Sequence, residues 1–422
     1  SDALGGVIHY YTKTPKLSEK TKVTSSFFHR YYSITNEITN NASVEIANKK
    51  WASFTSISHS DFGDLKMGEK RSHGFNNWGK VFQYSENSND FYSSTATENS
   101  DVNLQRNTAY NQTDLLQKFF IPLTDKTELK LNFQYSTSSD IPRFDRLDEK
   151  HEGTLKFAEW YYGPQERLLI SPQLDINPGK SWLDKGTFTL AYQNIKESRI
   201  QRKLSSLERS YRNENVDIFS VNGDFMIPLS KNENRAFTYG FEFLHNDVIS
   251  DAYGKTLEVL GNDIIGCSDN FNVQARYPDG GSRYVSSAVY LGYREDVNAK
   301  STLNSGVRYT RTNLKASWID QSIIVLPETN IKLDNSALTA TLGYVYKPNK
   351  NIQLNTVISS GFRSPNIDDV GRVREKSGNI TVPNIHLKPE YAYSAEIGIQ
   401  KYFNDKKFRF GFNTYYTLLQ HY

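Results

Sequence analysis

The sequence predicts an all-β protein, an antiparallel transmembrane β-barrel. About a dozen stretches alternate apolar and polar residues, and Leu129–Tyr135 and Phe237–Phe243 are clear examples. A period of two places one set of side chains on each face of a sheet, so one face is apolar and aromatic and the other is polar. Short and long connections alternate between these stretches. This combination is typical of outer-membrane barrels, which face lipid outside and water inside.

The alternation predicts fifteen strands in sequence order, most of them roughly 10 to 18 residues long, as a tilted strand that crosses a bilayer must be. Strands of a soluble sandwich are nearer to about 5 or 6 residues, and a soluble β-repeat protein would show a fixed repeat period that this chain lacks. We expect strands over residues 21–32, 37–48, 50–61, 113–122, 127–138, 165–176, 186–203, 215–228, 235–248, 284–296, 300–316, 335–347, 351–361, 390–403 and 406–420.

The connections between these strands fall into two classes. Short ones cover residues 123–126, 230–234, 297–299, 348–350 and 404–406, and long ones cover 62–112, 139–164, 249–283, 317–334 and 362–389. Because the two classes alternate, all the long loops lie on one side, as extracellular loops do in bacterial barrels. The polar face should line the lumen through Lys130, Asn132, Gln134, Thr238, Glu242, Tyr290, Arg294, Glu396 and Gln400.

Composition agrees with a large barrel. The 422 residues contain 27 Tyr and 24 Phe, which suit aromatic girdles at the membrane interfaces. The chain contains no run of about 18 apolar residues, so no membrane-spanning helix is predicted. The net charge of +3 gives no reason to expect a nucleic-acid partner, and the single cysteine, Cys267, permits no internal disulfide. Because no catalytic motif is found, we do not expect an enzyme.

The strand count predicts that the chain is a fragment. Bacterial single-chain barrels have an even number of strands and must close, because an open edge in lipid leaves backbone groups unpaired. Fifteen is odd, and the sequence stops inside the last predicted strand at His421 and Tyr422. No signal peptide opens the chain. We therefore expect a barrel that is truncated before closure and lacks both ends.

The first fifteen residues read differently from the rest. Ser1 to Pro15 contain Gly5 and Gly6, which permit a tight turn, followed by a short strand pattern that Pro15 ends. This stretch resembles the last strand of the plug domain in TonB-dependent outer-membrane receptors. The resemblance implies two parts, the C-terminal end of a plug at residues 1–15 and a transmembrane β-barrel at residues 16–422.

A second resemblance lies in the last long loop. Gly361–Ile367 and Val382–Glu390 look like the paired boxes that flank one extracellular loop in the same receptor family. Their prolines also mark where strands leave and re-enter the sheet, and Arg363 and Glu390 could pair across the strand tops. The box residues are Phe362, Arg363, Pro365, Asn384, Leu387, Pro389 and Glu390. Since the family has about 22 strands around a plug, about 15 of them would be present here.

The resemblance implies a function and a location. Receptors of this family actively transport iron compounds across the outer membrane of Gram-negative bacteria, in contact with its lipid. They are driven by an inner-membrane complex of the TonB type through an N-terminal segment that this chain lacks. A passive porin or a surface adhesin built on a barrel is the alternative from another class, although a plug in a wide pore argues against a passive channel.

The cargo remains open between haem, also when delivered by a haemoprotein, and a ferric siderophore. Either would be cargo rather than a permanent cofactor. Segments 140–147 and 158–165 resemble haem and haemoglobin receptors, and segment 275–282 resembles receptors for iron compounds. We slightly favour haem, whose iron takes His or Tyr as an axial ligand. Between the two boxes, residues 366–383 contain no histidine, so His386 is the candidate iron ligand. The candidate cargo-binding residues are His386, His73, His151, Arg363, Trp160, Tyr161 and Tyr162.

Overall fold

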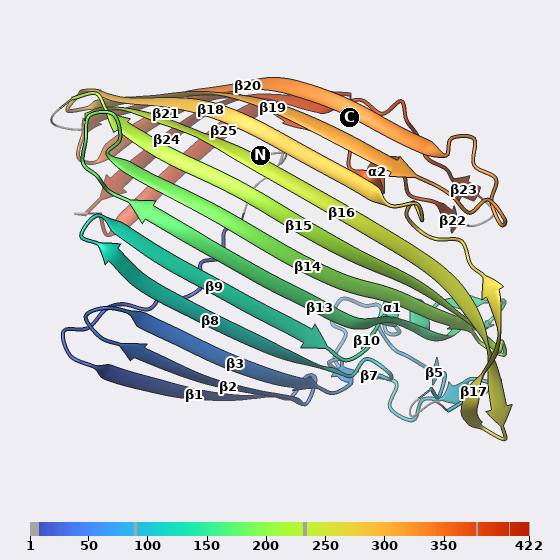
Figure 1. The fold of residues 1–422 in the computed structure, drawn as a ribbon. Helices are drawn as coiled ribbons and strands as arrows, with labels where there is room; N and C mark the ends of the chain where they lie inside the picture. The colour runs from blue at the N-terminus through green and yellow to red at the C-terminus, as the bar shows by residue number, and fades with distance from the viewer. Residues whose placement is uncertain (1–7, 88–90, 231–233, 377–378, 405, 422) are drawn as a thin grey trace.

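A computed structural model describes residues 8–87, 91–230, 234–376, 379–404 and 406–421. These residues form one large curved antiparallel sheet of 17 strands (Figure 1). Of the 17, β10 and β17 are short additions, and the other fifteen run the length of the sheet in sequence order. These fifteen are β1 (Lys22–Tyr32), β2 (Glu37–Ala47), β3 (Ala52–Phe62), β8 (Tyr110–Thr124), β9 (Thr127–Ser138), β13 (Phe157–Ile176), β14 (Lys185–Lys203), β15 (Glu208–Pro228), β16 (Arg235–Leu260), β18 (Ser282–Asn298), β19 (Ser301–Ser317), β20 (Asn330–Asn349), β21 (Ile352–Arg363), β24 (Glu390–Phe403) and β25 (Phe408–Gln420).

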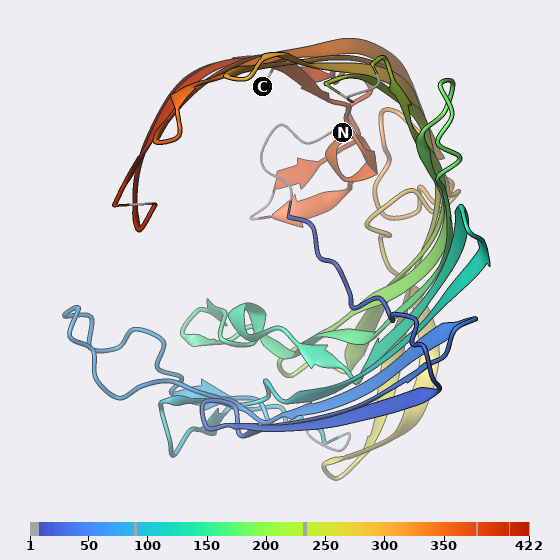
Figure 2. The same cartoon turned by 90° about the vertical axis from the view of Figure 1, so that its left-hand side faces the viewer.

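The sheet curves into an incomplete barrel wall. Each long strand pairs with its neighbours in the sequence, from β1 with β2 through to β24 with β25. Figure 2 shows the wall as an open arc with β1 and β25 at its two edges. Within the described residues, β1 and β25 do not pair with each other. The predicted antiparallel topology is confirmed.

All fifteen predicted strands are present, but several extend further toward the long loops. β13 begins at Phe157 rather than at residue 165, because Gly163 and Pro164 form a bulge in the strand instead of a loop. β16 continues to Leu260, and β17 (Asp263–Asn272) pairs back onto it within the predicted loop 249–283. The signal for this hairpin is the Gly261–Asn262 turn, with Gly261 at φ +65°.

The remaining elements are small and lie in the long loops. Two helices of four residues are α1 (Phe144–Leu147) and α2 (Ile367–Val370). The short strands are β4 (Leu65–Lys66), β5 (Gln83–Tyr84), β6 (Thr97–Glu98), β7 (Leu104–Gln105), β10 (Ile141–Pro142), β11 (Lys150–His151), β12 (Thr154–Leu155), β22 (Arg374–Lys376) and β23 (Asn379–Thr381). None of the helices in the described ranges is long and apolar enough to span a membrane.

The N-terminal segment identifies the inner face of the sheet. Of the predicted plug strand, residues 1–7 lie outside the described residues, and residues 8–15 are irregular and cross the concave side (Figure 2). There Lys118 Nζ donates a hydrogen bond to the Thr12 carbonyl at 3.1 Å, and Lys13 Nζ lies 4.6 Å from the Phe54 ring centroid. Lys118 and Phe54 are cross-strand partners, so both mark the inner face. Strand alternation places all nine predicted lumen residues on this face.

The outer face carries an apolar band that ends in charged residues. Val289, Tyr309 and Leu338 lie side by side on β18, β19 and β20, and each is 45% or more exposed. Two residues closer to the long loops, Arg311 of β19 replaces the apolar side chains. Exposed apolar residues on this side are expected to contact lipid, and the charges mark the level of the headgroups.

Candidate cargo-binding surface

The two box segments are joined by ion pairs at the tops of their strands. Arg363 and Glu390 are cross-strand partners on β21 and β24, and Arg363 Nη1 lies 2.9 Å from Glu390 Oε1. Arg363 also pairs with Asp369 at 2.5 Å, and Asp369 belongs to a capping box with Asn366 at the start of α2. Pairing with Asp369 and Glu390 raises the pKa of Arg363. This arrangement matches the structural pairing that the sequence suggested.

Apolar box residues hold α2 against the inner side of the sheet. Val370 is buried with Leu314 of β19 and Ile331 of β20, and Ile367 and Leu387 pack on the same cluster. Phe362 is 2% exposed and Pro365 is also buried. The box loop is therefore a packed cover over the ends of β19 and β20 rather than a free loop.

A second loop reaches the same helix. Tyr277, in the predicted segment 275–282, donates a hydrogen bond to Asp368 Oδ1 of α2 at 2.7 Å. Arg372 pairs with Asp368 at 3.0 Å, and Arg276 lies 3.5 Å from it. Burial and the bond to Asp368 raise the pKa of Tyr277. Two segments that separately resembled iron-compound receptors thus meet, although about 90 residues separate them.

Charged side chains continue from this contact down the inner face of β14 and β15. Arg199 Nη1 lies 2.7 Å from Glu214 Oε2, and its other terminal nitrogen pairs with Glu197. Burial, reinforced by Glu197, raises the pKa of Glu214 to about 7, although Arg199 and Arg276 oppose the shift. Arg212 donates to the Gln274 carbonyl at 3.0 Å, and burial lowers its pKa. These five residues form what we call the inner rim: Glu197, Arg199, Arg212, Glu214 and Arg276.

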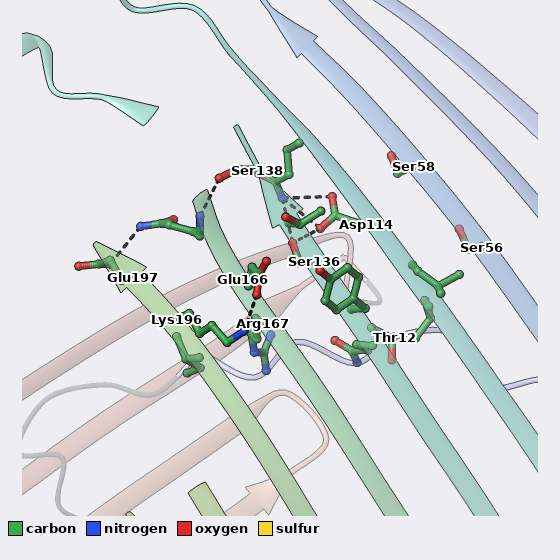
Figure 3. A pocket seen from close by; sticks show the side chains of 18 residues that line it. Thr12, Ser56, Ser58, Asp114, Ser136, Ser138, Glu166, Arg167, Lys196 and Glu197 are labelled. Atoms are coloured by element: carbon green, nitrogen blue, oxygen red, sulfur yellow. Dashed lines mark hydrogen bonds and ion pairs between the residues drawn. The ribbon is translucent and has the colours of Figure 1, made fainter. Parts of the chain in front are cut away.

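A hollow of about 490 Å³ lies on the inner face and reaches Glu197 of the inner rim (Figure 3). Ser56, Asp114 and Ser136 line it, together with Thr12 from the N-terminal segment. Glu197 belongs both to the hollow and to the inner rim, and Gln165 donates to it at 3.0 Å. The inner rim and the hollow therefore meet at Glu197.

The predicted aromatic cluster is divided between the two faces of β13. Trp160 and Tyr162 lie on one face in an edge-on contact of 5.3 Å, with Arg143 stacked 4.8 Å from Trp160. Trp160 is 7% exposed and packs with Leu147 of α1. Tyr161 points to the opposite face, and burial raises its pKa. In this arrangement Trp160 is covered by the chain itself.

The predicted histidines lie apart from one another. His386 is exposed, and only its backbone N–H is engaged, with Asn384 Oδ1 at 3.0 Å. His73 is exposed beside the rings of Phe75 and Trp78, and its Nδ1 accepts the Phe75 N–H at 3.2 Å. His151 is exposed on β11. Within the described ranges, no three His, Cys, Asp or Glu side chains are grouped as a metal site.

One buried ion cluster on the outer face was missed by sequence reasoning. Glu159 lies 2.7 Å from Arg202 and 2.6 Å from Arg209, and Arg202 has no exposed side-chain surface. Tyr92, from the segment between β5 and β6 in the long loop that follows β3, stacks 5.1 Å from Arg202. Sequence reasoning also missed the inner rim. Its four strand residues alternate along β14 and β15 on the face that carries Gln193, and this parity is the signal that could have located them.

The curved antiparallel sheet and the loops packed over its strand ends are features of an outer-membrane β-barrel. A family model described as "TonB dependent receptor-like, beta-barrel" matches residues 10–422. The chain therefore belongs to the TonB-dependent receptor family, as the sequence predicts. Members of this family are transporters rather than enzymes, and they lie in the outer membrane of Gram-negative bacteria.

Solved structures show the same fold at low sequence identity. They include the copper transporter OprC (TM-score 0.67, 10% identity, 97% of this chain and 55% of that chain). The haemophore receptor HasR of Serratia marcescens, solved with haemophore and haem, has a TM-score of 0.62 at 16% sequence identity. The match covers 95% of this chain and 55% of that chain. The siderophore receptor PiuA from Acinetobacter baumannii has a TM-score of 0.62 at 13% sequence identity, and the match covers 96% of this chain and 57% of that chain. This chain spans about half the length of these structures. None of the curated proteins matches it.

Proposed function

We propose that this chain forms barrel wall and extracellular loops of a receptor that takes up an iron compound across the outer membrane. One observation carries the proposal: the box loop and the loop at Tyr277 close over the wall at Asp368, directly above an inner face lined with polar groups. A cover of this kind suits a receptor that captures cargo and passes it inward. An inner-membrane complex of the TonB type would supply the energy through a plug and an N-terminal coupling segment.

Haem, free or released by a haemoprotein, is the cargo that we favour. His386 presents an exposed imidazole beside the cover, and none of its described contacts engages a ring nitrogen. His73 is a weaker candidate for the iron ligand than His386. Its Nδ1 accepts a hydrogen bond, so in the neutral ring Nε2 carries the proton. Coordination through Nε2 would require that proton to move to Nδ1 and would break this hydrogen bond. His386 is therefore the proposed iron ligand.

A ferric siderophore is the second candidate, and the inner rim favours it. Three arginines, Arg199, Arg212 and Arg276, line the route below the cover, and ferric chelates that carry negative charge would be attracted to them. A siderophore that binds these arginines would not need a histidine ligand.

A haem titration distinguishes the two candidates. The full-length receptor in detergent should give a sharpened, shifted Soret band with ferric haem, and His386→Ala should weaken that band because the axial ligand is lost. His59→Ala, which removes an exposed histidine from the outer face of β3, is the matched control. A spectrum identical to that of free haem would remove haem and move ferric siderophores to first place.

A further inference from the structure

The inner rim contains buried polar atoms that have no partner. Glu214 is 7% exposed and Ser250 of β16 is 3% exposed, yet Glu214 Oε1 and Ser250 Oγ make no hydrogen bond. The Nε atoms of Arg199 and Arg276 are also buried and unpaired. Buried polar groups in proteins nearly always find a partner, and one left unpaired costs roughly 1–3 kcal/mol. These four atoms lie together, so the inner rim and Ser250 offer a ligand several polar groups that the described contacts leave unpaired.

Two direct cross-strand pairs of the inner rim carry like charges. Arg199 lies directly opposite Arg212, and Glu197 lies directly opposite Glu214. Like charges in direct cross-strand pairs are destabilising. Arg212 has no carboxylate within ion-pair distance in the part of the chain that the structure describes. A bound anion between the arginines would relieve this repulsion.

The balance of charge selects an anion rather than a cation. The inner rim and the adjoining contact at α2 contain four guanidinium groups, from Arg199, Arg212, Arg276 and Arg372, and three carboxylates, from Glu197, Glu214 and Asp368. The Nε of Arg372 is unpaired as well. When Glu214 is protonated, its carboxyl can also donate a hydrogen bond to an anion.

We propose that the inner rim binds carboxylate groups of the iron compound as it passes from the cover into the lumen. The planar, forked guanidinium matches a carboxylate in two parallel hydrogen bonds. Haem propionates and the carboxylates of a ferric chelate present the same chemistry. The proposal rests on the proposed function, since it names the chemical class of that cargo. Arg276 and Arg212 are the central residues, because Arg276 joins the cover to the rim.

The test uses pairs of iron compounds that differ in free carboxylates. The full-length receptor in detergent is titrated with ferric haem and with haem dimethyl ester, whose propionates are blocked, and binding is followed by tryptophan fluorescence. A second pair is ferric citrate and an uncharged ferric trihydroxamate. Arg276→Gln and Arg212→Gln should each weaken binding of the carboxylate-bearing member by about 10- to 100-fold, the range of a charged hydrogen bond, and leave the other member unchanged.

Matched variants keep this test interpretable. Arg276→Lys retains the charge and should restore part of the affinity, whereas Arg311→Gln on the outer face should change nothing. Heat-modifiable migration on gels shows whether each variant is folded, and Arg212→Gln replaces Arg276→Gln if the latter is not. Equal binding of acid and ester, unaffected by either substitution, would overturn the carboxylate site and leave iron uptake intact. If no iron compound binds the folded receptor, both proposals fail.

The pH dependence of binding gives an independent readout. Glu214 is faced by Glu197 and Arg199 from β14, Arg212 from β15, Ser250 from β16 and Arg276 from the loop. With a pKa of about 7, Glu214 becomes charged as the pH rises and then competes with the cargo for the arginines. Ferric citrate should therefore bind more weakly at about pH 8 than at about pH 6, and Glu214→Gln should remove this difference. An unchanged pH profile in the variant would contradict the site.

Discussion

At the scale of single residues, the extracellular ends of the strands depend on a few buried charges. Arg202 has no exposed side-chain surface and reaches Glu159, which also holds Arg209. Such a pair need not stabilise the fold relative to apolar residues, but breaking one side leaves an uncompensated charge in the interior. Tyr92 closes the cluster from above, so a long loop is fastened to the wall at this point.

We predict that Glu159→Gln lowers the free energy of unfolding by about 3–5 kcal/mol, because Arg202 would remain buried without its counter-charge. Urea unfolding of the full-length receptor in detergent, followed by tryptophan fluorescence, measures the change. Glu208→Gln is the control. It removes an exposed carboxylate from the start of β15 and should shift the free energy of unfolding by less than about 0.5 kcal/mol. Equal shifts for the two variants would show that the cluster is not specially important.

At the scale of elements, neighbouring strands place three cations in one row on the outer face. Lys315 of β19 lies between Arg283 of β18 and Lys332 of β20 as a direct cross-strand partner of both. Arg283 has Asp247 at 2.9 Å. The central position, Lys315, is therefore flanked by like charge on two sides.

Lys315→Glu should raise stability by about 0.5 kcal/mol, because one substitution converts two repulsive cross-strand pairs into attractive ones. The temperature at which the folded band is lost on semi-native gels, compared at low salt, measures it. Since exposed charges are screened, the gain should shrink at about 1 M salt. Arg311→Glu is the counterpart control and should destabilise, because Arg311 holds Asp334 at 2.7 Å. A neutral or negative effect of Lys315→Glu would refute the analysis of the row.

At the scale of the whole molecule, the membrane determines which parts of the structure can be predicted from the sequence. Lipid on one side and water on the other force the alternation seen at Phe237–Phe243, so the crossing strands and their order were predictable. Beyond the lipid this contrast is weaker, and the extensions of β13 and β16 were therefore read as loops. The contact between Tyr277 and Asp368 was not predictable either, because no periodic pattern links residues so far apart.

The candidate site was predicted in part for the same reason. Arg363 and Glu390 sit at the ends of neighbouring strands, so their pairing followed from topology. Burial of Trp160 beneath α1 depends on how a loop folds back, and local sequence carries little information about that. Of the inner-rim arginines, Arg199 lay in a predicted strand, Arg212 in a connection and Arg276 in a predicted loop. Their grouping could not be predicted, because it depends on what lies across the strands.

Cys267 offers a native chemical handle on the orientation of this wall. It is exposed on β17, on the hairpin that extends β16 beyond the apolar band, and it is the only cysteine of the chain. A thiol-reactive dye that cannot cross membranes should label it on intact cells, and Cys267→Ser should remove the label from β17. Dye uptake only after the cells are broken would mean that the long loops face the periplasm. The same attachment point would let a fluorophore report cover movements without any engineered residue.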